Sequence, residues 1–135
     1  MSRIKIQLPG QFNFSTTISI RITDLNYGGH VGNDTILSLL HEARMQFLKS
    51  FDYTEMKFEN VSLIMSDVAI EFKAELFYGN VIKVFVTANN FTRVGFDIYY
   101  KLMNENTIAA IAKTGMVCFD YEKRRVVSVP VNLLM

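Results

Sequence analysis

The stretch that decides the fold covers residues 21–48 and reads RITDLNYGGHVGNDTILSLLHEARMQFL. Its first part, residues 23–30, is rich in turn formers and predicts a loop. From Asn33 or Asp34, either of which can cap a first turn with its side-chain oxygen, the pattern changes to helical spacing. Apolar residues then fill about half of the helical circumference as far as Phe51. This wide apolar arc predicts a long helix embedded against a sheet.

Alternation of apolar and polar residues predicts strands on both sides of that helix. One predicted strand precedes it, over residues 12–22, and four follow it, over 68–76, 82–88, 96–102 and 107–120. Residues 52–60 form the connection that leaves the helix, and short turns join the later strands. Because short turns join antiparallel neighbours, the pattern predicts an α+β fold in which one helix covers an antiparallel sheet.

The composition limits the kind of protein this can be. We expect one domain spanning residues 1–135, with a formal net charge of +1 and no basic patch of the kind that nucleic-acid binding needs. Apolar runs are shorter than the roughly 20 residues that cross a bilayer, and the N-terminus lacks an apolar signal segment. The single cysteine, Cys118, fits a packed thiol in a reducing compartment and leaves no Cys-based metal site. We therefore expect a cytoplasmic protein without nucleic-acid, membrane or metal partners.

Three motifs resemble those of one known family. Asp24 ends the first strand, a Gly-His-Val-x-Asn stretch at residues 29–33 leads into the helix, and a Glu-Ala-Arg triplet lies at residues 42–44. This arrangement is similar to hotdog acyl-CoA thioesterases of the 4-hydroxybenzoyl-CoA thioesterase type, and the resemblance runs over nearly the whole chain. It implies the hotdog fold, an antiparallel β-sheet wrapped around one long central α-helix. It also implies hydrolysis of an acyl-CoA or acyl-carrier thioester, at a site between the subunits of a homodimer or homotetramer.

The resemblance also assigns candidate site residues. Asp24 is the candidate general base or nucleophile. His30 and Asn33 are candidates to orient Asp24, the attacking water or the carbonyl. The main-chain amides near Gly32 and Asn33 lie at a helix N-terminus, where they can stabilise the oxyanion that forms on the carbonyl. Gly29 and Gly32 are the loop residues expected to contact substrate.

Other charged residues have less specific roles. Glu42 is a second candidate catalytic carboxylate, although a solvated position bonded to Gln46 one turn further on explains it more simply. Arg93 or Lys73 would contact the phosphates of coenzyme A, which is part of the substrate, so we expect no separate cofactor. Arg44 falls inside the apolar arc and needs a carboxylate partner or a route to solvent.

Two alternative functions remain open on the sequence alone. A hotdog enoyl-CoA hydratase or dehydratase would pair Asp24 with His30. Five residues separate these two here, one more than in the usual hydratase pattern, and the Glu-Ala-Arg triplet favours the thioesterase. The other alternative is a non-catalytic acyl-CoA-binding module that uses the same crevice to carry or sense its ligand.

Overall fold

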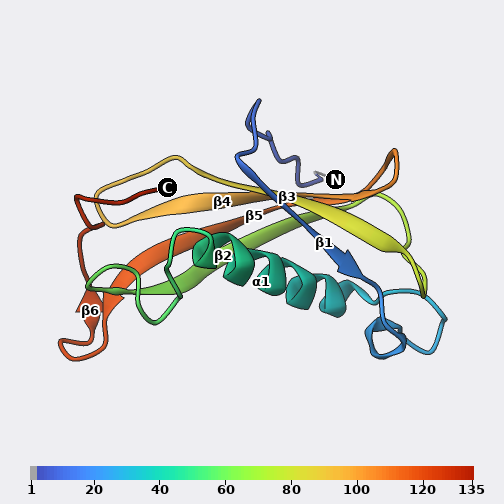
Figure 1. Cartoon of the computed structure of the whole chain (residues 1–135), viewed down its shortest axis with the longest axis horizontal. Coiled ribbons are helices and arrows are strands. Elements are labelled where there is room, and N and C mark those ends of the chain that lie inside the picture. The colour runs from blue at the N-terminus through green and yellow to red at the C-terminus, as the bar shows by residue number, and fades with distance from the viewer. Residues whose placement is uncertain (1–2) are drawn as a thin grey trace.

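The computed structural model describes residues 3–135 and consists of an antiparallel sheet with one long helix packed on it (Figure 1). The strands are β1 (Phe14–Ser19), β2 (Ser62–Phe72), β3 (Val81–Asn89), β4 (Gly95–Asn104), β5 (Thr107–Asp120) and β6 (Arg125–Val126). Their order across the sheet is β1-β3-β4-β5-β2, with β6 paired to β5. The helix α1 (Asn33–Lys49) lies against one face, and the predicted hotdog fold is therefore confirmed.

The start of α1 differs from our prediction by one residue. Gly32 has an extended backbone, and its carbonyl accepts the first helical hydrogen bond, from the amide of Ile36 at 3.2 Å. Gly32 is therefore the N-cap. The prediction that Asn33 or Asp34 caps the helix is wrong, because both residues already lie inside the first turn.

The apolar arc of α1 faces the sheet, as its spacing predicts. The helix ends at Lys49, two residues before the predicted end at Phe51. Its buried residues are Ile36, Leu39, Leu40, Ala43, Arg44, Phe47 and Leu48. They pack against apolar side chains of the sheet, among which Tyr100 is fully buried. The predicted carboxylate partner of the one charged residue in this face, Arg44, is Glu55.

Strand β2 runs from residue 62 to 72 rather than over the predicted 68–76. Its first part pairs with β5 but contains the continuous apolar run 63–65, so alternation does not reveal it. A shift of register between Met65 and Asp67 interrupts the pattern again. The first strand is shorter than predicted because residues 22–24 form a 3-10 turn instead.

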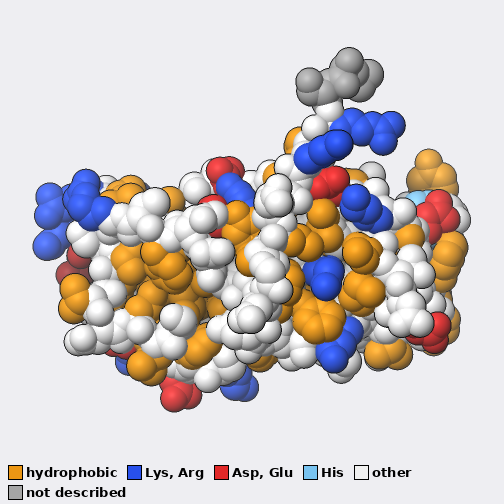
Figure 2. Space-filling view, turned by 90° about the horizontal axis from the view of Figure 1, so that it is seen from above, with side chains coloured by type: hydrophobic (Ala, Val, Ile, Leu, Met, Phe, Trp, Pro, Cys, Tyr) orange, Lys and Arg blue, Asp and Glu red, His pale blue; other side chains and the backbone are white. Residues whose placement is uncertain are grey.

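The face of the sheet away from α1 carries the N-terminal arm, residues 3–12, and Figure 2 shows it with basic and hydrophobic side chains gathered together. Ile6 donates its amide to Glu71 Oε2 at 2.6 Å, which ties the arm to β2. The ammonium group of Lys101 lies 5.1 Å from the centre of the Phe85 ring, a cation–π distance. These contacts keep the lysine charge beside aromatic surface on this outer face.

The single thiol lies in the core. Cys118 in β5 is fully buried, and burial raises its pKa to about 11. The prediction of a packed thiol is confirmed. Within residues 3–135, the structure contains no helix with the length and hydropathy needed to cross a membrane.

Candidate active site

Asp24 is held at the end of the 3-10 turn that follows β1. Its side chain is 7% exposed, and its Oδ2 accepts a hydrogen bond from the main-chain amide of Arg21 at 2.8 Å. The Arg21 guanidinium, itself largely exposed, lies 3.4 Å from Oδ1. These contacts fix the orientation of the carboxylate while it still borders a cleft.

The loop after Asp24 closes on itself and leads to the start of α1. Leu25 and Val31 form an antiparallel bridge, and the amide of Asn26 donates to the carbonyl of His30 at 2.9 Å. Gly29 has a φ of 86°, a left-handed conformation that glycine adopts without steric cost. In this bridge Leu25 lies opposite Val31. The backbone of Asp24, which precedes Leu25, is therefore directed toward Gly32, which follows Val31 and caps the helix.

The helix start offers free hydrogen-bond donors. The main-chain amides of Asn33 and Asp34 donate to no acceptor within residues 3–135. Free amides at a helix N-terminus carry a partial positive charge and favour a negatively charged ligand. The helix start therefore has free donors of the kind that an oxyanion needs.

Asp24 and Glu42 line the same cleft, of about 540 Å³, between β1 and α1. Gln46 Nε2 donates to Glu42 Oε2 at 2.7 Å, which is the predicted bond across one helical turn. Thr16 in β1 in turn donates its hydroxyl to Gln46 Oε1. The Glu42 side chain is exposed but oriented by this chain of contacts.

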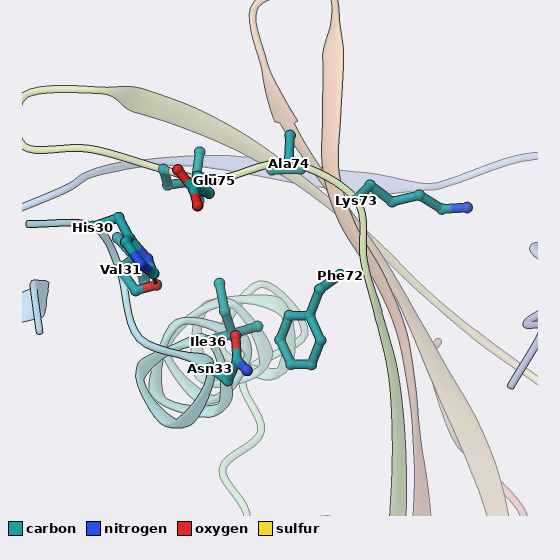
Figure 3. Close-up of a pocket in the computed structure, with 10 residues that line it drawn as sticks. His30, Val31, Asn33, Ile36, Phe72, Lys73, Ala74 and Glu75 are labelled. Atoms are coloured by element: carbon teal, nitrogen blue, oxygen red, sulfur yellow. Dashed lines mark hydrogen bonds between the residues drawn. The ribbon is translucent and has the colours of Figure 1, made fainter. Parts of the chain in front are cut away.

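His30 and Asn33 line a different cavity, of about 260 Å³, between the loop, the start of α1 and residues 72–76 (Figure 3). His30 Nδ1 lies 3.2 Å from the carbonyl of Val31, so the ring is held by its neighbour. In Figure 3 the side chain of Lys73 extends away from these residues. Of the four candidate catalytic residues, Asp24 and Glu42 therefore line one cavity, and His30 and Asn33 line another. Within one chain, Asp24 and His30 do not share a cavity.

Arg93 lies at the opposite end of the sheet. Ser19, at the end of β1, pairs with Val81 at the start of β3, whereas Arg93 follows Asn89 at its end. The nine residues of β3 therefore separate the two ends by roughly 30 Å at about 3.3 Å per residue. Within one chain, Arg93 does not reach the cleft that contains Asp24.

A buried polar network beside α1 was missed in part from the sequence. Arg44 Nε donates to Glu55 Oε2 at 2.8 Å, and Arg44 Nη1 donates to the hydroxyl of Tyr100 at 3.1 Å. Tyr100 also shares a 2.7 Å hydrogen bond with the hydroxyl of Thr114. His41, which the sequence places beside the apolar arc, is exposed and bonds the other oxygen of Glu55 at 2.8 Å. From the sequence, only the need of the Arg44 charge for a partner pointed to this network. Glu55 could not be identified as that partner, because the connection in which it lies, residues 52–60, has no periodic pattern.

The network changes the ionisation of its carboxylate. Burial alone raises the pKa of Glu55, but the hydrogen bonds and charges of Arg44 and His41 outweigh it and lower the pKa below its ordinary value. Burial likewise lowers the pKa of Arg44, and its contacts with Tyr100 and Glu55 outweigh that effect and raise it. Both members of the ion pair are therefore stabilised in their charged forms.

Comparison with known proteins places this geometry in a family. A family model for the thioesterase-like superfamily matches residues 20–134. The chain is 27% identical over 108 residues to an Aquifex aeolicus (strain VF5) protein that carries the name "Putative esterase", which covers 78% of this chain and 83% of that one.

Solved structures show the same fold. The 1,4-dihydroxy-2-naphthoyl-CoA thioesterase from Synechocystis gives a TM-score of 0.78 at 21% identity, over 87% of this chain and 89% of that chain. The DHNA-CoA thioesterase from Staphylococcus aureus gives a TM-score of 0.77 at 17% identity, over 84% and 78%.

The solved structures show the hotdog fold, and the family model makes the protein a hotdog-type thioesterase, a thioester hydrolase. The chain belongs to the thioesterase-like superfamily, and the family resemblance drawn from its motifs is confirmed.

Proposed function

We propose that the protein hydrolyses acyl-CoA thioesters in the cytoplasm, with Asp24 as the catalytic carboxylate. One observation carries this proposal: the Asp24 carboxylate, held in place by Arg21, borders a cleft, and the loop closed by the Leu25–Val31 bridge leads from it to the free amides of α1. A base or nucleophile and oxyanion donors are the two requirements of acyl transfer. The packed single thiol is compatible with a reducing compartment.

The reaction follows from these two groups. Asp24 takes a proton from a water molecule whose oxygen attacks the thioester carbonyl, or its own carboxylate oxygen attacks and the resulting anhydride is hydrolysed. The carbonyl oxygen becomes negatively charged and is stabilised by the amides of Asn33 and Asp34. The carbon–sulfur bond then breaks, and its electron pair leaves on sulfur as a thiolate, which is stable enough near neutral pH to leave without a dedicated acid.

The proposal also gives accessory roles to Glu42, to His30 and to a cation that binds coenzyme A. Glu42, oriented by Gln46, would hold the water or the carbonyl in the cleft, and His30 would act from the neighbouring cavity. No metal or separate cofactor is needed for this chemistry. Of the two cations suggested for coenzyme A, Arg93 lies far away within one chain, and the Lys73 side chain extends away from His30 and Asn33, so neither is favoured over the other.

We also propose that two copies assemble along β2. This strand is an edge of the sheet, and the apolar side chains of Met65, Val68 and Phe72 on it are exposed. Leu37 on α1 is exposed as well. A second copy paired with this edge would cover these side chains and could bring His30 and Asn33 of one subunit toward the Asp24 cleft of the other.

The test is release of free thiol from a panel of short, long and aromatic acyl-CoAs, measured for the natural protein and for Asp24→Asn. Hydrolysis that Asp24→Asn abolishes supports the proposal, and equal hydrolysis by both removes Asp24 from the mechanism. Loss of ultraviolet absorbance from an enoyl-CoA without thiol release would instead favour the hydratase. Tight acyl-CoA binding without turnover would favour the binding module.

A further inference from the structure

The cleft that contains Asp24 has the free side of an edge strand as one of its walls. Within residues 3–135, β1 is the first strand of the sheet and pairs only with β3, so its other side has no neighbouring strand. Residues 17–19 of β1 line the cleft. An unpaired strand edge presents main-chain N–H and C=O groups that can pair with another extended chain. Because the proposed dimer uses β2, at the opposite edge, it leaves this edge open.

The free main-chain groups of this wall belong to Thr17 and Ser19. Ile20 donates its amide to the carbonyl of Asn80 at 2.8 Å, so its N–H points to the side of β3. Because successive residues of a strand point their main-chain groups to opposite sides, those of Thr17 and Ser19 point to the free side. Their side chains are exposed, whereas the side chain of Thr16 contacts α1. Thr17 and Ser19 therefore border the cleft with their main chain.

The row of free groups leads directly to the proposed catalytic carboxylate. Arg21, two residues after Ser19, has an extended backbone and donates its amide to Asp24 Oδ2 at 2.8 Å. The side of the chain that is free at Thr17 and Ser19 is therefore the side on which Asp24 is held. Alternate residues of a strand are about 7 Å apart. An extended ligand whose reacting group lies at Asp24 thus meets Ser19 first and Thr17 next.

The rest of the lining suits a polar but uncharged chain. Of the nine residues of the described chain that line the cleft, only Ile18 and Leu39 are apolar, so a long hydrocarbon would gain little there. Two carboxylates, of Asp24 and Glu42, accompany one cation, Arg21, and their field disfavours the phosphates of a nucleotide. A chain of neutral amides avoids both penalties.

We propose that the cleft holds the pantetheine arm of the substrate thiol, paired with the free edge of β1. Each of the two amides of this arm offers one N–H and one C=O, and the main chains of Ser19 and Thr17 each offer the same two groups. The amide nearer the sulfur pairs with Ser19, and the farther amide pairs with Thr17. This assignment rests on the proposed thioesterase function, which places the thioester carbon at Asp24.

Three thioesters of one acid test the pairing. Hexanoyl-pantetheine carries both amides, hexanoyl-N-acetylcysteamine keeps only the nearer one, and S-pentyl hexanethioate replaces that one with methylene groups. We expect kcat/KM to fall about tenfold at each step, because each lost amide removes two main-chain hydrogen bonds. Equal values for the three thioesters, or the highest value for S-pentyl hexanethioate, would overturn the proposal.

Proline variants connect this preference to the strand edge. Ser19→Pro and Thr17→Pro each remove an N–H that points away from β3, so the ladder with β3 keeps its bonds. Ser19→Pro should reduce the kcat/KM ratio of the N-acetylcysteamine to the S-pentyl thioester about threefold, and Thr17→Pro should reduce the ratio of the pantetheine to the N-acetylcysteamine thioester by as much. Ser15→Pro is the matched control, because Ser15 has the same orientation in β1 but does not line the cleft. Ratios that change no more in the two variants than in the control would reject the pairing.

Binding of an unreactive arm separates this proposal from the hydrolase proposal and needs no variant. S-hexyl-pantetheine is a thioether, and its analogue with both amide nitrogens methylated lacks the two N–H donors. Calorimetry measures the two affinities. Tighter binding of the unmethylated thioether supports the arm site even if no thioester is hydrolysed. Equal affinities alongside normal thioester hydrolysis would reject the arm site alone.

Two larger thiols carry the same arm, coenzyme A and an acyl-carrier protein. Hydrolysis of hexanoyl-CoA and of a hexanoyl carrier protein should both weaken in Ser19→Pro, and the higher kcat/KM of the two identifies the natural thiol. Sedimentation tests the competing occupant of the edge, a second copy of this chain. A particle that becomes smaller in Ser19→Pro or Thr17→Pro, with the substrate ratios unchanged, would assign the edge to that copy and overturn the proposal.

Discussion

Leu25 and Val31 pair across the loop between β1 and α1, and this bridge closes the loop that leads from Asp24 to the free amides at the helix start. The two parts of the candidate machinery come from different elements. A short loop with glycine at its left-handed position, Gly29, connects them. The geometry is therefore built by the backbone, and it should survive changes to the side chains that perform the chemistry.

Replacing Asp24 by Asn should reduce kcat/KM about 100- to 10,000-fold, the usual contribution of a general base. The amide keeps an oxygen that can accept from Arg21, so the melting temperature should change little. Thiol release and thermal unfolding measure the two effects. Asp52→Asn, at an exposed position of positive φ that tolerates Asn, is the control and should be fully active.

Replacing Glu55 alone should destabilise the protein more than replacing it together with Arg44. Glu55→Gln leaves a buried guanidinium without its counter-ion and should cost about 3 kcal/mol of unfolding free energy. The double variant Arg44→Met with Glu55→Gln should recover most of that loss. Urea unfolding measures both, with the exposed Glu122→Gln as control. A double variant no more stable than Glu55→Gln would show that the ion pair is not the source of the effect.

The same carboxylate should make stability depend on pH in the acid range. The folded-state pKa of Glu55 is lowered from 4.5 because the hydrogen bonds of Arg44 and His41 outweigh the effect of burial. A lowered pKa stabilises the folded state above the unfolded-state pKa, and this contribution is lost as pH falls through the folded-state value. The stability difference between the natural protein and Glu55→Gln should be constant above about pH 5.5 and shrink below pH 4.5. A difference that grows on acidification would contradict this assignment.

Charges on the β2 edge should separate the proposed dimer. Met65→Lys combined with Val68→Lys places two ammonium groups on exposed apolar positions, which opposes pairing with a second copy. Sedimentation should show a smaller particle, and thiol release should fall with it. Val131→Lys, at an exposed apolar residue in the C-terminal segment, should leave both unchanged. A natural protein that sediments as a monomer would reject the assembly.

The fold could be predicted from the sequence where one face of each element is buried. The spacing of apolar residues located α1 and the later strands, because burial on one side leaves a visible period. The start of β2 could not be found this way, since residues 63–65 are continuously apolar and a register shift follows. The cap was misplaced because Gly32 caps through its backbone alone, without a side-chain signal.

The site was predictable only as far as it is local. Asp24, Gly29 and Asn33 are close in the sequence, and the loop that joins them is short, so their motif could be recognised. The bond between Glu42 and Gln46 follows from helical geometry. In contrast, Glu55, the partner of Arg44, lies in a connection without periodicity and could not be identified from the sequence. The placement of the candidate residues in two separate cavities depends on how the whole loop packs, which the sequence pattern does not reveal.

The interior position of Cys118 has a consequence for an enzyme that liberates a free sulfhydryl at each turnover. The Cys118 thiol is fully buried and has a pKa of about 11, so it is scarcely deprotonated at neutral pH and is not accessible to molecules in solution. It therefore resists exchange with an oxidised form of the released thiol, and the protein should not become trapped as a mixed disulfide with its own product.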